Sequence, residues 1–453
     1  MDDLFIKNAK IVLADKVIDN GGVLVTKGKI KEIVTENEEC TAKEVLDIGG
    51  KYLFPGFIDS HVHLDEPGYQ HREDFYTGTE AAACGGITTI IDMPLNNKPP
   101  VYNKKIFNEK YNIVKNKALV DYGFWGALLN YNLNELDELN DAGALGFKCF
   151  MCEPGDDYTS LTLDEIEKSL QIIKKFNGVA GFHCEDYQII QTLENEKLLN
   201  KKFTARDYLD SRPVQAELNA TKDVLNIAKN TGCRIHICHV SDPLVAEEIK
   251  KAKENGVKVT AETCAHYLIF SEEDLINKGA LYKCSPPLRK KSSVEKIWKY
   301  LADGTIDSIC SDHSPATLEE KNKDTKGIFS AWGGMSSIQS TFQVIFNYLV
   351  VEKNLSPTLI SKIFSENPAK IFGIFGQKGA IKPGFDADFT IVDADKEWEI
   401  TRESLKTKIK ESAFVGLKGK GIAIGTILRG ELISKDGEVI ANHRNGHILK
   451  KSR

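Results

Sequence analysis

Residues 55–68 read Pro-Gly-Phe-Ile-Asp-Ser-His-Val-His-Leu-Asp-Glu-Pro-Gly. The apolar run from Tyr52 to Ile58 is typical of a buried strand. Alternate side chains of a strand share one face, so His61 and His63 are predicted to point the same way. Two neutral imidazoles at a strand end can bind one divalent metal ion. Two surface histidines in a loop are the alternative, and the choice depends on further ligands elsewhere in the chain.

Strand-like and helix-like runs alternate after this stretch. Further strand-like runs lie at residues 88–93, 122–129, 145–151, 179–184, 234–240, 258–263 and 306–311. Helix-like runs lie at residues 73–83, 163–176, 214–229, 243–255, 292–301, 336–351 and 359–372. Eight strands alternating with helices predict parallel pairing and a closed α/β barrel of the (β/α)8 TIM type. An open doubly wound sheet is the alternative, but no Gly-x-Gly-x-x-Gly follows a strand to support a dinucleotide site.

The two ends of the chain carry short strand-like runs without long helical patterns. Asn, Asp, Gly and Pro-Gly turn residues separate these runs, which include residues 387–392 and 426–433 near the C-terminal end. We predict that residues 1–50 and 379–453 pair into one small β domain, beside a barrel domain of residues 51–378.

The composition is ordinary for a globular protein. Over 453 residues the net charge is −6, with acidic and basic residues interspersed, which gives no electrostatic reason to expect nucleic acid or a membrane as partner. No apolar run is long enough to cross a bilayer, and the first residues lack the pattern of a signal peptide. The ten cysteines are scattered and are expected to be reduced. We therefore expect a cytoplasmic enzyme.

Residues that can bind metal recur at the predicted C-terminal ends of the strands, where barrel active sites lie. They are His61 and His63 on the first strand, Lys148 on the fourth, His183 on the fifth, His239 with His236 as a second candidate on the sixth, and Asp312 on the eighth. Taken alone, His183 would be interpreted as a core histidine. Together, these positions predict a metal centre.

Lys148 lies among Phe147, Cys149, Phe150 and Met151. Buried lysines are rare unless they are paired. Burial near a divalent cation would lower the pKa of Lys148 and leave a free amine. A free amine can react with carbon dioxide to form a carbamate, whose two oxygens could bridge two metal ions. A lysine that extends to solvent at the strand end is the alternative.

The chain resembles the cyclic amidohydrolases of the allantoinase, hydantoinase and dihydroorotase group over nearly its whole length. The resemblance rests on residues 55–63 (PGFIDSHVH), 146–148 (GFK), 238–241 (CHVS), 311–315 (SDHSP) and 381–388 (IKPGFDAD). It implies a (β/α)8 barrel with a small β-sandwich formed from both chain termini, in agreement with the pattern above. It also implies a homotetramer.

The resemblance further implies a binuclear metal site. The implied ligands are His61, His63 and Asp312 for the first ion, His183 and His239 for the second, and carboxylated Lys148 as the bridge. His236 would then be a core residue. Zinc is the expected metal, with cobalt, manganese, iron and nickel as alternatives.

Within this group the chain is most similar to the allantoinases, at residues 63–68, 92–96, 262–268, 283–289 and 331–334. A dihydroorotase-like site carries an arginine two residues after the second histidine, to bind the carboxylate of its substrate. Here that position is Asp65, which would repel a carboxylate, whereas allantoin is uncharged. A hydantoinase or dihydropyrimidinase-like cyclic amidase is the second hypothesis. A non-catalytic scaffold is the third, and the filled ligand positions count against it.

The implied reaction is hydrolysis of the cyclic amide of allantoin to allantoate, a step of purine and ureide catabolism. A hydroxide bridging the metal ions would attack the ring carbonyl, which one ion would polarise. Asp312 would act as the base and pass the proton to the leaving nitrogen.

Other polar residues near the strand ends have two interpretations each. Asn96, Ser285 and Trp332 are candidates for substrate contact, with loop packing as the alternative. Glu185 and Asp186 either orient metal-binding histidines or serve as acidic residues at the start of a helix.

Overall fold

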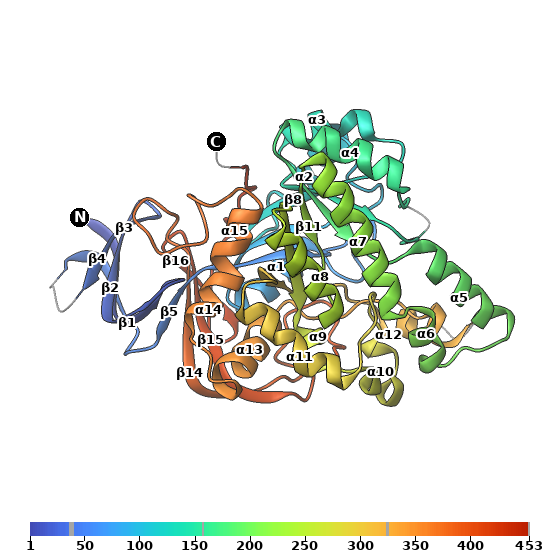
Figure 1. The fold of residues 1–453 in the computed structure, drawn as a ribbon. Helices are drawn as coiled ribbons and strands as arrows, with labels where there is room; N and C mark the ends of the chain where they lie inside the picture. The colour runs from blue at the N-terminus through green and yellow to red at the C-terminus, as the bar shows by residue number, and fades with distance from the viewer. Residues whose placement is uncertain (36–39, 156–157, 323–325, 452–453) are drawn as a thin grey trace.

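A parallel eight-stranded sheet forms the centre of the molecule (Figure 1). The computed structural model describes residues 1–35, 40–155, 158–322 and 326–451. The central strands, in spatial and chain order, are β6 (Phe57–Val62), β7 (Ile87–Asp92), β8 (Asp121–Ala127), β9 (Gly146–Phe150), β10 (Val179–His183), β11 (Arg234–Ile237), β12 (Val259–Cys264) and β13 (Ser308–Cys310). A parallel bridge from Val62 to His313 brings the first strand beside the last. The predicted (β/α)8 barrel is confirmed.

Helices follow the strands around the barrel (Figure 1). They are α1 (Phe75–Cys84), α2 (Lys104–Val114), α3 (Leu136–Ala142), α4 (Leu163–Lys175), α5 (Tyr187–Leu199), α6 (Ala205–Ser211), α7 (Val214–Thr231), α8 (Pro243–Glu254), α9 (Ala265–Ile269), α10 (Glu272–Lys278), α11 (Lys291–Ala302), α12 (Leu318–Lys321), α13 (Thr341–Phe346), α14 (Thr358–Ser361) and α15 (Asn367–Ile371). The predicted helical runs are all present, and π-helical segments extend the last two at Asn347–Glu352 and Lys362–Glu366.

Helix α4 illustrates why a predicted helix forms. Thr162 accepts from the backbone of Glu165, whose side chain bonds back to Thr162, so the first turn is capped at both groups. The buried residues of this helix recur at the spacing of one helical face. Helix α5 was not predicted. Ile190 is its single buried residue, so the buried positions of this helix do not form the periodic face that identifies a helix in the sequence.

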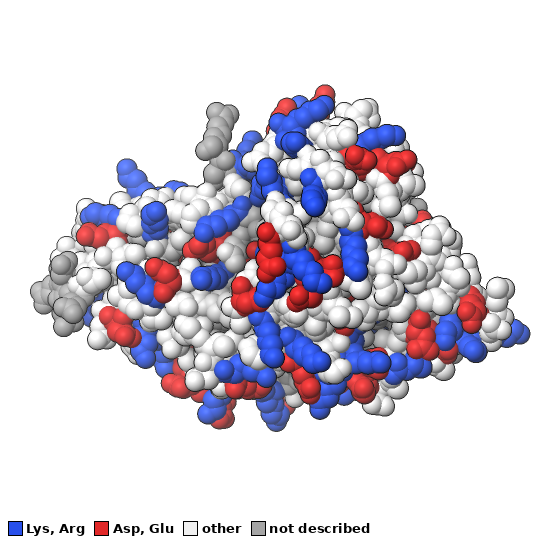
Figure 2. Space-filling view, viewed as in Figure 1, with Lys and Arg blue, Asp and Glu red and all other residues white. Residues whose placement is uncertain are grey.

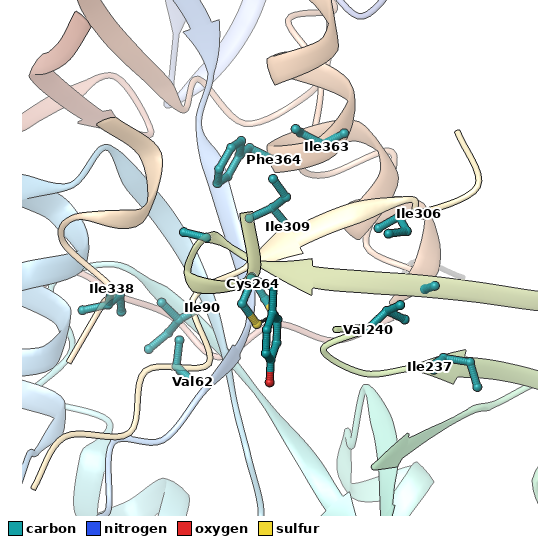
Figure 3. Packing of buried hydrophobic residues seen from close by; sticks show 14 of the residues in the cluster. Val62, Ile90, Ile237, Val240, Cys264, Ile306, Ile309, Ile338, Ile363 and Phe364 are labelled. Atoms are coloured by element: carbon teal, nitrogen blue, oxygen red, sulfur yellow. Dashed lines mark hydrogen bonds between the residues drawn. The ribbon is translucent and has the colours of Figure 1, made fainter. Parts of the chain in front are cut away.

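Apolar side chains of the strands fill the spaces between the barrel and its outer segments. Figure 3 shows Ile309 of β13 beneath Ile363 and Phe364 of the segment Lys362–Glu366, with all three side chains buried. Burying one such side chain stabilises the fold by about 1.5–3 kcal/mol. This packing fixes the strand ends on which the polar residues sit.

The stretch from Tyr52 to Ile58 is not one strand, contrary to the prediction. Its first part, β5 (Tyr52–Pro55), belongs to a second sheet, and β6 starts at Phe57. The chain passes between the sheets at Gly56, where an added Cβ would collide with the side chains of Thr88 and Asp388. The residue between the two strands must therefore be glycine.

The second sheet is built from both ends of the chain, as predicted. Its strands run in the order β17-β16-β15-β14-β5-β1-β2-β3, with β4 paired to β1. They are β1 (Asp2–Val12), β2 (Val17–Thr26), β3 (Lys29–Thr35), β4 (Ala42–Asp47), β14 (Phe389–Glu399), β15 (Lys418–Leu428), β16 (Glu431–Lys435) and β17 (Glu438–Val439). The domain limits after residue 50 and before residue 379 stay a prediction.

The surface and the thiols fit the composition. Figure 2 shows Lys and Arg interspersed with Asp and Glu over the visible face. No helix within the described part of the chain has the length and apolar character needed to span a bilayer. No disulfide joins the cysteines of the described residues, and Cys149 and Cys152, whose Cys-x-x-Cys spacing resembles a redox pair, are both thiols. Burial raises the pKa of the Cys152 thiol to about 12, which makes it unreactive.

A buried ionic cluster joins the barrel to the terminal sheet. The Nζ atom of Lys378 lies 2.5 Å from Asp121, 2.9 Å from Asp386 and 2.5 Å from Asp388. Arg429 also pairs with Asp121, at 2.5 Å. The two cations offset three buried carboxylates that would otherwise be strongly destabilising.

Replacement of Lys378 tests this cluster. Lys378→Met should lower the free energy of unfolding by about 3–5 kcal/mol, because it leaves buried carboxylates without their cation. Lys29→Met is the matched control: Lys29 pairs with Asp386 from a half-exposed position, so its loss should cost less than about 1 kcal/mol. Denaturant unfolding monitored by circular dichroism measures both values, and equal losses would contradict the assigned role of Lys378.

Candidate active site

A cavity of about 290 Å³ opens at the C-terminal ends of the barrel strands. It brings together all six metal ligands that the resemblance implies and all three candidates for substrate contact, but not His236. These residues are His61, His63, Lys148, His183, His239 and Asp312, together with Asn96, Ser285 and Trp332.

His61 of β6 and His63, the residue after β6, both face the carboxylate of Asp312. The Nε2 atoms of His61 and His63 lie 3.3 Å and 3.2 Å from Oδ1 of Asp312. Burial disfavours the charge of Asp312, but the surrounding imidazoles outweigh this effect and hold its pKa well below its usual range. The carboxylate is therefore ionised and positioned within reach of both imidazoles.

A second pair of histidines lies beside the first. Nδ1 of His183 is 3.1 Å from Nε2 of His239, and burial lowers the pKa of both side chains. The backbones of His239 and Asp312 have φ values of 36° and 46°, a left-handed region that costs non-glycine residues about 1–3 kcal/mol. Strained residues at the ends of two barrel strands are typical of functional sites.

Lys148 is fully buried in β9 and reaches the cavity. Its Nζ atom has no hydrogen-bond partner among the described residues. Burial acts to lower the pKa of Lys148, as predicted, but Cys238 and the nearby carboxylates outweigh burial and raise the pKa. The predicted lowering applies to Lys148 beside a divalent cation and stays a prediction, whereas without a cation the acidic groups of the site stabilise the ammonium.

Glu262 of β12 supports this site, and sequence analysis missed it. Its Oε1 lies 2.6 Å from Nδ1 of His61, and its Oε2 lies 3.2 Å from Nε2 of His236. His236 is fully buried and contacts Thr260, which places it in the core behind the cavity. A glutamate inside an otherwise uncharged strand was the feature that could have identified this contact.

The two acidic residues after β10 have separate roles. Oε2 of Glu185 lies 2.7 Å from Nε2 of His183 and accepts from Arg212 at 2.7 Å. Against the effect of burial, Arg212 and His183 lower the pKa of Glu185 to about 2. Asp186 instead caps the start of α5, where it accepts two backbone N–H bonds. Each of the two predicted interpretations thus applies to one residue.

Comparison with known proteins agrees with this geometry. The model of the amidohydrolase family matches residues 52–433. The chain belongs to the amidohydrolase family. An allantoinase of Salmonella choleraesuis (strain SC-B67) is 38% identical over 438 residues, which are 95% of each chain, and an allantoinase of Escherichia coli (strain K12) gives the same values. An L-hydantoinase (dihydropyrimidinase) from Arthrobacter aurescens has a TM-score of 0.96 at 31% identity over the whole of both chains. The predicted resemblance to cyclic amidohydrolases is confirmed.

One wall of the cavity in this amidohydrolase is formed by residues 329–334, called the strap below. Two lysines hold the strap by hydrogen bonds to its backbone carbonyl groups. Lys283 donates to the carbonyl oxygen of Ala331 at 2.6 Å, and Lys321 donates to that of Trp332 at 3.0 Å. Burial lowers the pKa of both lysines to about 7. The two amines set the position of Trp332 at the cavity.

The remaining polar candidates of the amidohydrolase site are held by neighbours. Ser285 lies 2.8 Å from the hydroxyl of Tyr208, and the indole of Trp332 donates to Ser314 at 3.3 Å. Asn96 lines the cavity with a φ of 59°. Ser285 and Trp332 thus bond to neighbouring side chains, and contact of all three residues with substrate stays a prediction.

Asp65 does not act as the sequence suggested. Its side chain is fully buried and is absent from the described lining of the cavity. Burial raises the pKa of Asp65 well above its usual value. The predicted repulsion of a substrate carboxylate therefore has no direct contact through which to act. Arg72, which follows in the same loop, does line the cavity.

Removing one lysine of the strap should loosen the cavity wall. In Lys321→Met, the amides of Trp332 and Gly334 should exchange hydrogen roughly tenfold faster, because unpaired buried carbonyls cost about 1–3 kcal/mol. Hydrogen–deuterium exchange with peptide mapping measures this change, with Lys105→Met, at an exposed position, as the control. Unchanged exchange in the strap would show that other contacts hold it.

Proposed function

We propose that this amidohydrolase opens the ring of allantoin by hydrolysis to give allantoate, with two divalent cations in the cavity. The observation that carries the proposal is the convergence of four histidines, one lysine and one aspartate on the cavity of a chain 38% identical to allantoinases over nearly its full length. This function would place the enzyme in purine and ureide catabolism.

The donor atoms of the site suit divalent cations. Nζ of Lys148 reaches the cavity and is buried without a hydrogen-bond partner in the described part of the chain. Such an orphan atom costs about 1–3 kcal/mol unless a ligand satisfies it. His61, His63 and Asp312 also place ligand atoms within 4.8 Å of one another. Nitrogen and carboxylate ligands favour zinc, with cobalt, manganese, iron and nickel as alternatives, and a carbamate on Lys148 would add two oxygens.

The residues of the chain supply orientation and proton transfer. Bound cations would acidify a water molecule and polarise the amide carbonyl of the ring. Asp312, kept ionised by the imidazoles around it, would accept the proton of the attacking water and deliver it to the ring nitrogen as the C–N bond breaks. Glu262 and Glu185 fix the rings of His61 and His183 through the second ring nitrogen.

A hydantoinase or dihydropyrimidinase activity is the second candidate. It is supported by the likeness to the L-hydantoinase from Arthrobacter aurescens over the whole chain. Asn96, Ser285 and Trp332 are proposed to contact the substrate in either case. A homotetramer and a cytoplasmic location stay predictions from the sequence.

A substrate comparison tests the proposal. Protein reconstituted with Zn²⁺ in bicarbonate should have a higher kcat/KM for allantoin than for hydantoin, dihydrouracil or dihydroorotate. Activity should disappear after EDTA treatment and return with metal, because the cations activate the water. A preference for hydantoin or dihydrouracil would support the second candidate. Absence of turnover on every ring, with metal bound, would contradict an enzymatic role.

Asp312→Asn should abolish proton transfer while preserving the fold. We expect kcat for allantoin to fall roughly 100- to 10,000-fold, the usual contribution of a general acid–base group. Metal content measured on the same sample separates lost proton transfer from lost ligation. Asp186→Asn, which alters only the cap of α5, is the control and should stay within about twofold of the wild type, since asparagine is an equally good cap. Near wild-type turnover by Asp312→Asn would refute its role as base.

A further inference from the structure

Arg72, in the loop between β6 and α1, brings a hydrogen-bond donor to the cavity that the proposed mechanism does not use. The side chain is 6% exposed and lines the cavity. Its Nη1 atom is buried and has no hydrogen-bond partner within the described residues. A buried guanidinium nitrogen without an acceptor is costly, and its position at a cavity points to an acceptor on the ligand.

Neighbouring groups fix the orientation of this guanidinium. Its Nε and Nη2 atoms donate to Oε1 of Glu320 at 2.8 Å and 2.6 Å. The guanidinium carbon lies 3.7 Å from the ring centre of Trp332 and 4.7 Å from that of Tyr69. The backbone N–H of Trp332 also donates to the carbonyl of Glu320, at 3.0 Å. Arg72 is therefore fixed in place without a ligand. Its Nε and Nη2 atoms are bonded to Glu320, and its Nη1 atom remains available to an acceptor.

The charge of Arg72 is already balanced. Against the effect of burial, Arg72 lowers the pKa of Glu320 to about 2, so the carboxylate is ionised and the pair carries no net charge. A substrate carboxylate would have to compete with Glu320 for the same guanidinium. A neutral carbonyl oxygen needs only the directional N–H of Nη1. The electrostatics of this wall therefore favour an uncharged acceptor.

The location of this wall shows which part of a substrate it would meet. Arg72 is held by Glu320 of α12 and by the loop residues Tyr69 and Trp332, none of which is a proposed metal ligand. The scissile carbonyl of a bound ring must face the cluster around Asp312. A group on Arg72 would therefore belong to a substituent of the ring.

We propose that Arg72 is a specificity residue that donates from Nη1 to the carbonyl oxygen of the uncharged ureido substituent on the ring. This assignment rests on the proposed function and deepens it, because the ureido group is what distinguishes allantoin from unsubstituted hydantoin. Arg72 thereby selects ring substrates that carry a neutral amide or urea carbonyl on the side chain.

The test compares two rings in two arginine variants. Arg72→Lys keeps a cation to pair with Glu320 but removes the Nη1 donor of the guanidinium. We expect kcat/KM for allantoin to fall roughly 10- to 100-fold, as loss of a hydrogen bond from a charged donor implies. The kcat/KM of hydantoin as a substrate, or its inhibition constant as a competitive inhibitor, should change less than about threefold, since hydantoin lacks the ureido carbonyl oxygen. Arg444→Lys is the matched control, because Arg444 also stacks on a tyrosine and pairs with a glutamate, but outside the cavity.

The outcomes separate the two levels of inference. A loss confined to allantoin supports the role of Arg72. An equal loss of kcat/KM for allantoin and for hydantoin would overturn it, because Arg72 would then shape the cavity without binding the ureido substituent. Unchanged kinetics with allantoin in Arg72→Lys would also overturn it, while wild-type turnover of allantoin would leave the proposed function intact. A wild-type enzyme that ignores allantoin but opens another ring would overturn the proposed function and this assignment together.

Discussion

The backbone hydrogen bond from His63 to the carbonyl oxygen of His313, at 2.8 Å, closes the barrel at its functional end. It joins the strand end that carries the His-x-His pair to the loop that carries Asp312. Without this closure the two imidazoles and the carboxylate would lie at opposite edges of an open sheet. The site therefore depends on the circular arrangement of strands more than on any local sequence.

Around this closure, the protein accommodates buried charge by pairing it. Glu262 faces His61 and His236, and Glu185 faces His183 and Arg212. Breaking one such pair leaves an uncompensated buried charge, which costs about 3–5 kcal/mol. The same contacts fix the tilt of the imidazoles, so the groups that orient the ligands also contribute to the stability of the barrel. Stability and positioning cannot be altered independently here.

The barrel was predicted from the sequence, and so was the set of residues that the structure brings to one cavity, because both follow from local patterns. Apolar runs and helical faces alternate, and the polar residues stand where the strands end. The roles of Glu262 and Arg72 were missed because their partners lie far along the chain and only folding brings them near. The inference from Asp65 failed for another reason: spacing alone does not say whether a side chain faces the cavity. The split at Gly56 was missed because both halves of that run are equally apolar.

The junction strand β5 also constrains the order in which the chain can assemble. β5 pairs with β1 on one side and with β14 on the other, and the register couples Pro55 to Phe389. During synthesis β14 emerges only after every barrel strand has left the ribosome, so one edge of β5 stays open until β14 has been made. Closing so long a loop is entropically costly, and non-local strand pairing is slow. The terminal sheet is thus completed last, and an exposed strand edge is the aggregation hazard that the nascent chain carries until then.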